Sequence, residues 1–281
     1  MGEEAVTAAR IESGWAAVNG ANFFYRRAGD GPPLLLLHAG ICDGRMWDEQ
    51  VGEFARTHRV IVPDFRGFGQ TEMVAGPFAH RHDLLGLMDH LGVGRAILVG
   101  ASMSGETTLD FVLEYPSRVE ALILVGSALS GYRFVDAGTR AAWKASDAAL
   151  EAERLDEAAE IEMQTWLAGP RRKLEQIDPS LQARVRDMLI RSYATPPDLG
   201  EEQPLDPPAA GRLGDVRAPT LIIVGDEDQP DVVAVAGLLE AGIAGARKVV
   251  MHSTAHLPNM EQSATLNRIV RDFLAALPKH P

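Results

Sequence analysis

The strongest candidate for a reactive side chain is Ser102, in the segment Gly-Ala-Ser-Met-Ser-Gly at residues 100–105. An apolar run precedes this segment and a helical pattern follows it, so the sequence predicts a sharp turn from a buried strand into a helix. Such a turn needs small neighbours, because the backbone folds back and strains its central residue. Gly100 supplies one and Ser104 the other, where glycine is more usual. An ordinary serine at a helix N-cap is the alternative, but the context favours a nucleophile.

A nucleophilic serine needs a base to take its proton and an acid to orient that base. Of the eight histidines, His256 is preferred because it follows the last predicted strand and precedes the last helix, whereas His280, for example, lies in the tail. Asp226, Glu227 and Asp228 compete for the role of the acid, directly after the strand at residues 221–224. The N–H of Met103, at the start of the helix after the serine, can stabilise an oxyanion.

The elements that must position these side chains alternate along the chain. Apolar runs at residues 34–38, 60–64, 96–100, 121–125, 220–225 and 248–251 are separated or followed by helical patterns at 46–55, 82–91, 105–115, 232–241 and 262–277. Asn-Gly at residues 19–20, between two short apolar segments, predicts a hairpin. The alternation predicts an α/β fold with a parallel, doubly wound sheet.

The alternation stops after Ser127. Residues 139–149, 155–167 and 181–193 are predicted to be helical, and a proline-rich connector follows at 196–208. We expect no strand of the sheet between residues 130 and 211. The chain is therefore divided into a core (1–129 and 212–281) and an inserted helical lid (130–211) over the carboxyl ends of the strands. A separate helical domain is disfavoured, because the sheet on either side would then be incomplete.

Composition and the absence of certain motifs disfavour several classes of partner and cofactor. The 281 residues carry a net charge of −12, which disfavours nucleic acid and anionic membranes as partners. Apolar runs are too short to span a membrane, the acidic start at residues 1–4 does not fit a secretory signal, and the single cysteine excludes an intrachain disulfide. We expect a cytoplasmic protein, with its oligomeric state open. Without an H-E-x-x-H, a Cys/His cluster, a G-x-G-x-x-G or a Walker lysine, we expect no metal and no other cofactor.

The order of these segments resembles that of α/β-hydrolases: a D-x-R-G-x-G loop at residues 64–69, the serine turn, an acid and then a histidine. The resemblance covers nearly the whole chain outside the lid and implies an eight-stranded, mostly parallel sheet with helices on both faces. It also implies that Gly40, in the His-Ala-Gly segment at 38–40, gives the second oxyanion N–H. The family pattern G-x-x-D selects Asp228, with Asp226 as the alternative. His38 and Arg66 are expected to tie loops together.

Within that family the chain most resembles 3-oxoadipate enol-lactonase-like hydrolases, through residues 46–50, 76–78, 100–105 and 255–262. This implies cleavage of a small carboxylic ester or lactone through an acyl-enzyme, although Ser104 and His38 depart from the pattern of such lactonases. Meta-cleavage-product hydrolases, which break C–C bonds with the same triad, often carry an aromatic residue after the base, where this chain has Leu257. A binding protein without turnover is disfavoured because serine, acid and histidine occur in the expected order.

The substrate pocket is the least specified part of the site. Its candidate residues are Ile41, Trp143, Met163, Trp166 and Leu257. For the lid residues, packing of one helix on another is an equally good interpretation. Arg133 could hold a substrate carboxylate, but we favour a surface role for it.

Overall fold

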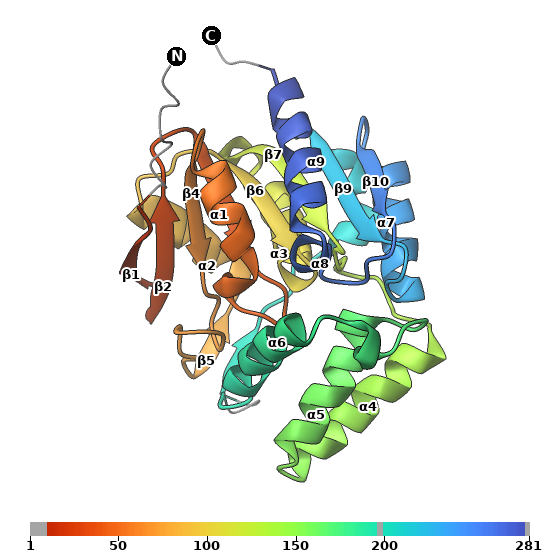
Figure 1. Ribbon diagram of the computed structural model, residues 1–281. Coiled ribbons are helices and arrows are strands. Elements are labelled where there is room, and N and C mark those ends of the chain that lie inside the picture. Colours follow the sequence, from red (N-terminus) through yellow and green to blue (C-terminus); the bar gives the residue numbers. More distant parts are fainter. Residues whose placement is uncertain (1–9, 196–198, 279–281) are drawn as a thin grey trace, which may run out of the picture.

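Within residues 10–195 and 199–278, which the computed structural model describes, eight strands form the central sheet in the order β1-β2-β4-β3-β6-β7-β9-β10 (Figure 1). From β4 to β10 neighbouring strands are parallel, whereas β1 and β2 are attached at one edge by antiparallel pairing. The strands are β1 (Glu12–Val18), β2 (Ala21–Ala28), β3 (Pro33–Leu37), β4 (Arg59–Pro63), β6 (Ala96–Ala101), β7 (Val119–Val125), β9 (Thr220–Gly225) and β10 (Arg247–Met251). The predicted mostly parallel, eight-stranded sheet is confirmed.

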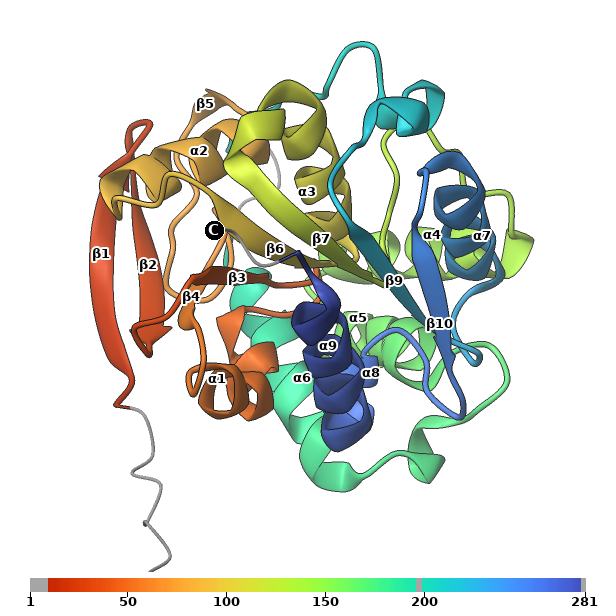
Figure 2. The same ribbon diagram turned by 90° about the horizontal axis from the view of Figure 1, so that it is seen from above.

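Helices cover both faces of the sheet (Figure 2). One face carries α1 (Asp48–Phe54), α8 (Pro258–Glu261) and α9 (Ser263–Ala276), and the other carries α2 (His80–His90), α3 (Met103–Glu114) and α7 (Pro230–Gly242). In β3, Leu34 and Leu36 pack toward the first layer, while Leu35 and Leu37 pack toward the second. A strand buried on both faces needs apolar residues at successive positions, which explains its uninterrupted leucines.

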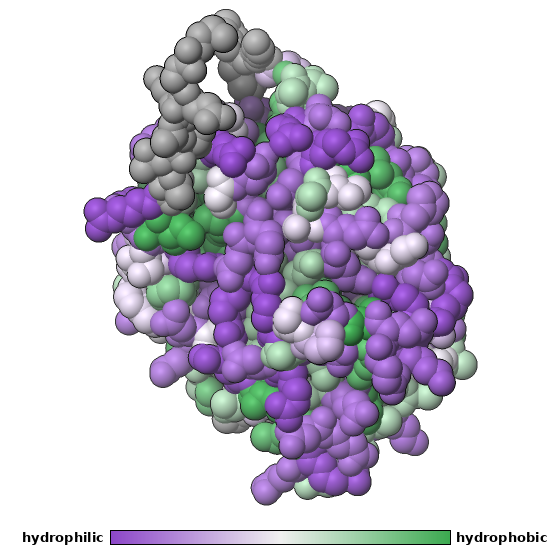
Figure 3. Space-filling view, in the orientation of Figure 1, coloured by the Kyte–Doolittle hydropathy of each residue, from purple (hydrophilic) through white to green (hydrophobic). Residues whose placement is uncertain are grey.

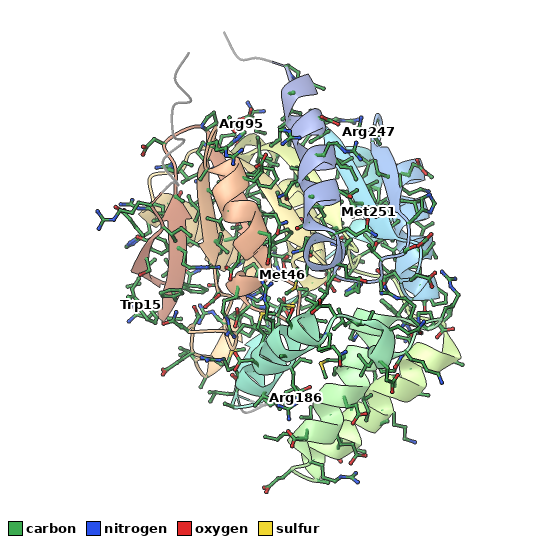
Figure 4. All side chains as sticks on the ribbon, viewed as in Figure 1. Trp15, Met46, Arg95, Arg186, Arg247 and Met251 are labelled. Atoms are coloured by element: carbon green, nitrogen blue, oxygen red, sulfur yellow. The ribbon has the colours of Figure 1, made fainter. Side chains whose placement is uncertain are left out.

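The segment predicted to form a lid folds mainly into helices at one end of the sheet. In Figure 1, α4 (Ala137–Glu151), α5 (Leu155–Glu162) and α6 (Pro179–Ser192) lie below the strands. Helix α5 continues as the π-helical turn η3 (Met163–Ala168). Shorter helical turns are η1 (Gly44–Trp47), η2 (Pro116–Arg118), η4 (Leu174–Gln176), η5 (Ala209–Gly211) and η6 (Leu213–Asp215). In Figure 4, Arg186 marks this end of the molecule, and Arg95 and Arg247 mark the opposite end.

One short strand in this segment, outside the central sheet, was not predicted. The connector contains a short strand, β8 (Gly200–Glu202), which pairs in parallel with β5 (Gly76–Phe78) in a separate two-stranded sheet. The sequence Gly-Glu-Glu has no apolar residue and no alternation, so hydrophobic periodicity could not indicate this strand. It forms because main-chain groups of the two segments meet, and it attaches the connector to the core.

The hairpin at the start of the chain is confirmed, with Asn19 and Gly20 at φ 47° and 78° between β1 and β2. A buried ion pair fixes it to the rest of the core. Arg66 donates to Asp83 of α2 at 2.5 and 2.8 Å, and also to the Asn19 carbonyl at 2.9 Å. The guanidinium lies over the rings of Phe23 and Phe78. Arg66 thus joins its loop to helix α2 and to the hairpin turn, in a structural role as expected.

The face in Figure 3 is mainly hydrophilic, with scattered apolar side chains. No helix in the described ranges is long and apolar enough to cross a membrane. The acidic start at residues 1–4, the beginning of the connector at Pro196 and His280 lie outside the described residues.

Replacing Asp83 with alanine should strongly destabilise the fold, because it leaves the Arg66 guanidinium buried without its counter-charge. We expect a loss of about 3–5 kcal/mol in the free energy of unfolding, measured by urea denaturation. Asp89→Ala, on the same helix, removes the exposed partner of Arg118 and should cost no more than about 1 kcal/mol. Equal losses in the two variants would contradict this account of the buried pair.

Candidate active site

Ser102 lies on a strained turn between β6 and α3. Its backbone has φ 54° and ψ −114°, in a region that residues with a side chain rarely adopt. A Cβ added to Gly100 would overlap the Ser104 carbonyl oxygen, and one added to Gly105 would overlap Ser127. These close approaches explain why the turn needs small residues. The Ser102 hydroxyl makes no capping hydrogen bond to α3, so it does not act as the N-cap serine considered above.

Ser104 fits the turn by making hydrogen bonds that glycine could not make. Its side chain is fully buried, and its hydroxyl accepts from the Ala101 N–H at 2.8 Å and donates to the Leu37 carbonyl at 2.7 Å. The hydroxyl therefore joins the end of β3 to the turn after β6. This side chain stabilises the turn that carries Ser102 instead of distorting it.

His256 and Asp228 form a buried pair beside this turn. His256 Nδ1 lies 2.9 Å from Asp228 Oδ2 and 3.1 Å from Oδ1, and the two residues are 3% and 2% exposed. Asp228 follows β9 and His256 follows β10, so both come from loops at the carboxyl ends of parallel strands. The contact leaves Nε2 of the imidazole free of the carboxylate, which is the arrangement a general base needs.

The other two acids of the 226–228 run face elsewhere. Asp226 accepts hydrogen bonds from His252 Nδ1 at 2.8 Å and the Ser253 N–H at 2.7 Å. Glu227 pairs with Arg171 at 2.8 Å. Of the three candidates, only Asp228 contacts His256 among the interactions of the described residues.

The main chain after β7 brings Ser102 and the Asp228–His256 pair together. The Ser102 N–H donates to the Val125 carbonyl at 2.9 Å, and the Ser102 carbonyl accepts from the Ala128 N–H at 3.0 Å. Between these contacts lies Gly126, where an added Cβ would be 3.2 Å from His256 Nδ1 and 3.4 Å from Asp228 Oδ2. Gly126 has φ 52° and was not singled out from the sequence. Its position directly after β7, the strand beside the serine turn, is the signal that could have indicated it.

The two candidate oxyanion donors are neighbours. A Cβ on Gly40 would lie 3.6 Å from both Cβ and Sδ of Met103. Met103 is the first residue of α3, so its N–H has no acceptor within the helix. The loop after β3 and the first turn of α3 therefore meet next to Ser102.

His38 fixes the loop that carries Gly40. Its Nε2 accepts from the Phe65 N–H at 2.9 Å, and its Nδ1 lies 2.9 Å from the Ala39 carbonyl, to which it donates. Burial lowers the pKa of His38, although the Asp64 carboxylate opposes this effect. A neutral ring with one donor and one acceptor satisfies both bonds, so His38 joins two loops.

The candidate pocket residues divide into two groups. Trp166 lies against His256, with ring centroids 4.6 Å apart, and Trp143 lies 6.1 Å from Trp166. Ile41, half-buried, packs between the two core layers, while Met163 and Leu257 are buried in the layer with α1 and α9. Leu257 is fully buried and offers a ligand no surface.

Arg133 is exposed and lines a separate surface hollow of about 590 Å³ with Leu213 and Gly242.

Two aromatic residues were missed from the sequence. Phe134 lies 4.9 Å from Trp143, and Tyr132 lies 5.9 Å from Phe134, so a run of aromatic rings extends from His256 outward. Both residues follow β7 in a segment without periodicity, and only their proximity to the end of that strand could have indicated them.

Metal ligation was also considered for the described residues. Within residues 10–195 and 199–278, no group of three or more His, Cys, Asp or Glu side chains is arranged to hold a metal ion.

The fold and this arrangement of loops define a class of enzyme. A family model described as alpha/beta hydrolase fold matches residues 32–263, and the chain belongs to this family.

Relatives and solved structures give more particular names. The chain is 30% identical over 268 residues to a 2-hydroxymuconate semialdehyde hydrolase of Pseudomonas sp. (strain CF600), and the aligned region covers 88% of each chain. It is 29% identical over 272 residues to a 2-hydroxy-6-oxo-6-phenylhexa-2,4-dienoate hydrolase of Comamonas testosteroni, which covers 89% of this chain and 90% of the relative. The enol-lactonase from Burkholderia xenovorans LB400 has a similar structure, with a TM-score of 0.75, 27% identity and coverage of 93% of this chain and all of that one. The chain is thus a hydrolase whose similar proteins act on more than one type of bond.

Replacing Gly126 with alanine should impair the site, because the methyl group would press against the His256–Asp228 pair. We expect the rate at which a fluorophosphonate reagent labels the protein to fall by about 10-fold or more, since small displacements of a catalytic group are costly. Gly92→Ala is the matched control, because Gly92 has a similar φ of 64° but open space around it. It should cost about 1 kcal/mol of stability and leave labelling unchanged. Equal labelling of the Gly126 variant and the wild type would contradict the proposed contact.

Proposed function

We propose that this chain is a serine hydrolase that cleaves a small carboxylic ester or lactone with Ser102 as nucleophile, His256 as base and Asp228 as acid. The observation that carries the proposal is the buried contact of 2.9 Å between His256 Nδ1 and Asp228, joined through Gly126 to the strained turn of Ser102. A positive φ at a serine and a buried acid–imidazole pair both cost free energy, and acyl transfer accounts for both features.

The mechanism follows from the atoms involved. His256 Nε2 removes the proton from Ser102 Oγ, and the oxygen attacks the substrate carbonyl. The N–H groups of Met103 and Gly40 donate to the oxyanion of the tetrahedral intermediate, and Asp228 stabilises the imidazolium. His256 then returns the proton to the leaving oxygen. Water, activated by the same histidine, hydrolyses the acyl-enzyme.

Residues 130–211 act as the lid in this proposal. The turn η3 lies directly over the site, because the Trp166 carbonyl accepts from the His256 N–H at 3.2 Å. Helix α6 is held to the core by ion pairs of 2.6 Å between Arg45 and Asp187 and between Arg184 and Glu49. A cover of this kind excludes water from the reacting groups and shapes the pocket.

The side chains around His256 favour an uncharged substrate with an apolar group. Trp166, Trp143 and Phe134 present aromatic rings there. The two arginines that follow η3 are already paired, Arg171 with Glu227 and Arg172 with Glu261, the latter at 2.7 Å. A substrate carboxylate would have to displace one of these partners. An ester or lactone without a carboxylate meets no such cost.

C–C bond hydrolysis is the second candidate, and the names of the two relatives at 29–30% identity favour it. The dienoate named for the Comamonas relative carries a carboxylate, so this reading predicts a cation close to Ser102. For C–C hydrolysis, Arg133, Arg171 or Arg172 would have to turn toward the substrate carboxylate.

The test is a panel of p-nitrophenyl esters of acetate, butyrate and benzoate, an enol-lactone and a 2-hydroxy-6-oxo-dienoate, assayed with wild type and with Ser102→Ala. We expect ester or lactone turnover by the wild type and a loss of at least about 10³-fold in kcat for the variant. The benzoate should be cleaved with a lower KM than the acetate, because its ring can contact the aromatic residues.

Three outcomes would reject parts of the proposal. Full activity of the Ser102 variant would exclude the nucleophile. Turnover of the dienoate alone would replace ester hydrolysis by C–C cleavage. Tight binding without turnover of any substrate would indicate a binding protein.

A further inference from the structure

Trp166 contacts the candidate base in two ways. Its indole ring lies against the imidazole of His256, with centroids 4.6 Å apart and planes inclined by 40°. Its carbonyl also accepts the His256 N–H. The same residue therefore contacts both the ring and the backbone of His256, although it comes from the helical segment outside the sheet.

The position of the indole is itself fixed. Trp166 Nε1 donates to Glu162 Oε2 at 2.8 Å, one helical turn earlier, and Trp166 is only 7% exposed. Burial raises the pKa of Glu162, although the hydrogen bond from Trp166 opposes this effect. Whether charged or neutral, this carboxyl retains an oxygen that can accept from the indole.

The π-helical geometry of η3 makes these contacts available. In a π-helical turn the backbone pairs i to i+5, so carbonyls are redirected compared with an α-helix. Thr165 and Trp166 point consecutive carbonyls at the two loops of the site: the Thr165 carbonyl accepts from Gln229 Nε2, next to Asp228, and the Trp166 carbonyl accepts from His256. The turn therefore contacts the loops of both the acid and the base.

We infer that Trp166 is a positioning residue for His256: its indole, held by Glu162, keeps the imidazole oriented so that Nδ1 stays on Asp228 and Nε2 stays available to Ser102. This inference rests on the proposed function, since it gives the lid a part in activating the nucleophile. An imidazole joined only to Asp228 can still rotate about the bond to its Cβ. A flat ring packed on its face restricts that rotation, and a misoriented base would slow attack.

The main experiment measures labelling by a fluorophosphonate, which reacts with an activated serine without requiring the natural substrate. The maximal rate reports activation of Ser102, and the half-saturating concentration reports binding of the reagent. Trp166→Leu should lower the maximal rate by about 10- to 100-fold with little change in half-saturation. Trp166→Phe, which keeps an aromatic face, should recover most of the rate. Trp15→Leu, on the exposed edge strand β1, is the control for replacing a tryptophan and should behave like the wild type.

A second pair of variants tests the role of Glu162 without changing the ring. Glu162→Gln retains an oxygen for the indole N–H and should stay close to the wild-type rate, whereas Glu162→Leu should lose about 3- to 10-fold, because the ring is released. If Trp166→Leu fails to fold, as judged by circular dichroism, this pair of variants still tests whether the held indole activates Ser102.

The outcomes separate this inference from the proposed function. If the wild type is not labelled, the proposed function fails and the inference fails with it. If the wild type is labelled and Ser102→Ala is not, the proposed nucleophile stands. A wild-type maximal rate in Trp166→Leu, or a change confined to half-saturation, would then overturn the positioning role and leave Trp166 as a wall of the pocket. Equal rates for Glu162→Gln and Glu162→Leu would overturn the role of Glu162 in holding the indole.

Discussion

The positive φ of Ser102 is the constraint on which the surrounding structure depends. A serine at φ 54° stays in place only if its neighbours prevent relaxation. The main-chain bonds to Val125 and Ala128 hold it from β7, and the hydroxyl of Ser104 holds the turn to the end of β3. Strain at one residue is thus distributed over three adjacent parallel strands. Because those strands are buried on both faces, the free energy of packing opposes relaxation of the turn.

The same sheet explains why the loops of the site meet. Parallel strands end at one edge, so the residues that follow β3, β6, β7, β9 and β10 are brought together without any long-range pattern in the sequence. Gly40, Ser102, Gly126, Asp228 and His256 each follow a different one of these strands. The close packing of these loops leaves little room for a side chain at Gly126 and favours a neutral imidazole at His38, which satisfies two backbone groups at once.

Much of this arrangement could be predicted from sequence, because it depends on local patterns. Apolar runs gave the sheet, Asn19-Gly20 the hairpin, and the small residues around Ser102 the turn. Among Asp226, Glu227 and Asp228 the residues alone left a choice, since all three follow the same strand. The family pattern G-x-x-D selected Asp228, and Asp228 is the one that contacts His256. Strand β8 and the contact between Trp166 and His256 could not be predicted. The first depends on main-chain pairing, and the second joins residues about 90 positions apart through a π-helical turn, a rare element that sequence patterns seldom indicate.

The proposed division between core and lid has a consequence for how such a site would acquire specificity. In the proposed reaction, core loops supply the groups that acyl transfer requires, and their geometry is tightly restricted by packing. The proposed lid supplies the aromatic rings beside His256, so changes there would alter the proposed pocket while Ser102 and Asp228 remain in place. If Trp166 also orients the base, this independence is incomplete. A substitution in η3 that widened the pocket would at the same time release the imidazole, and the choice of substrate and the rate of attack would change together.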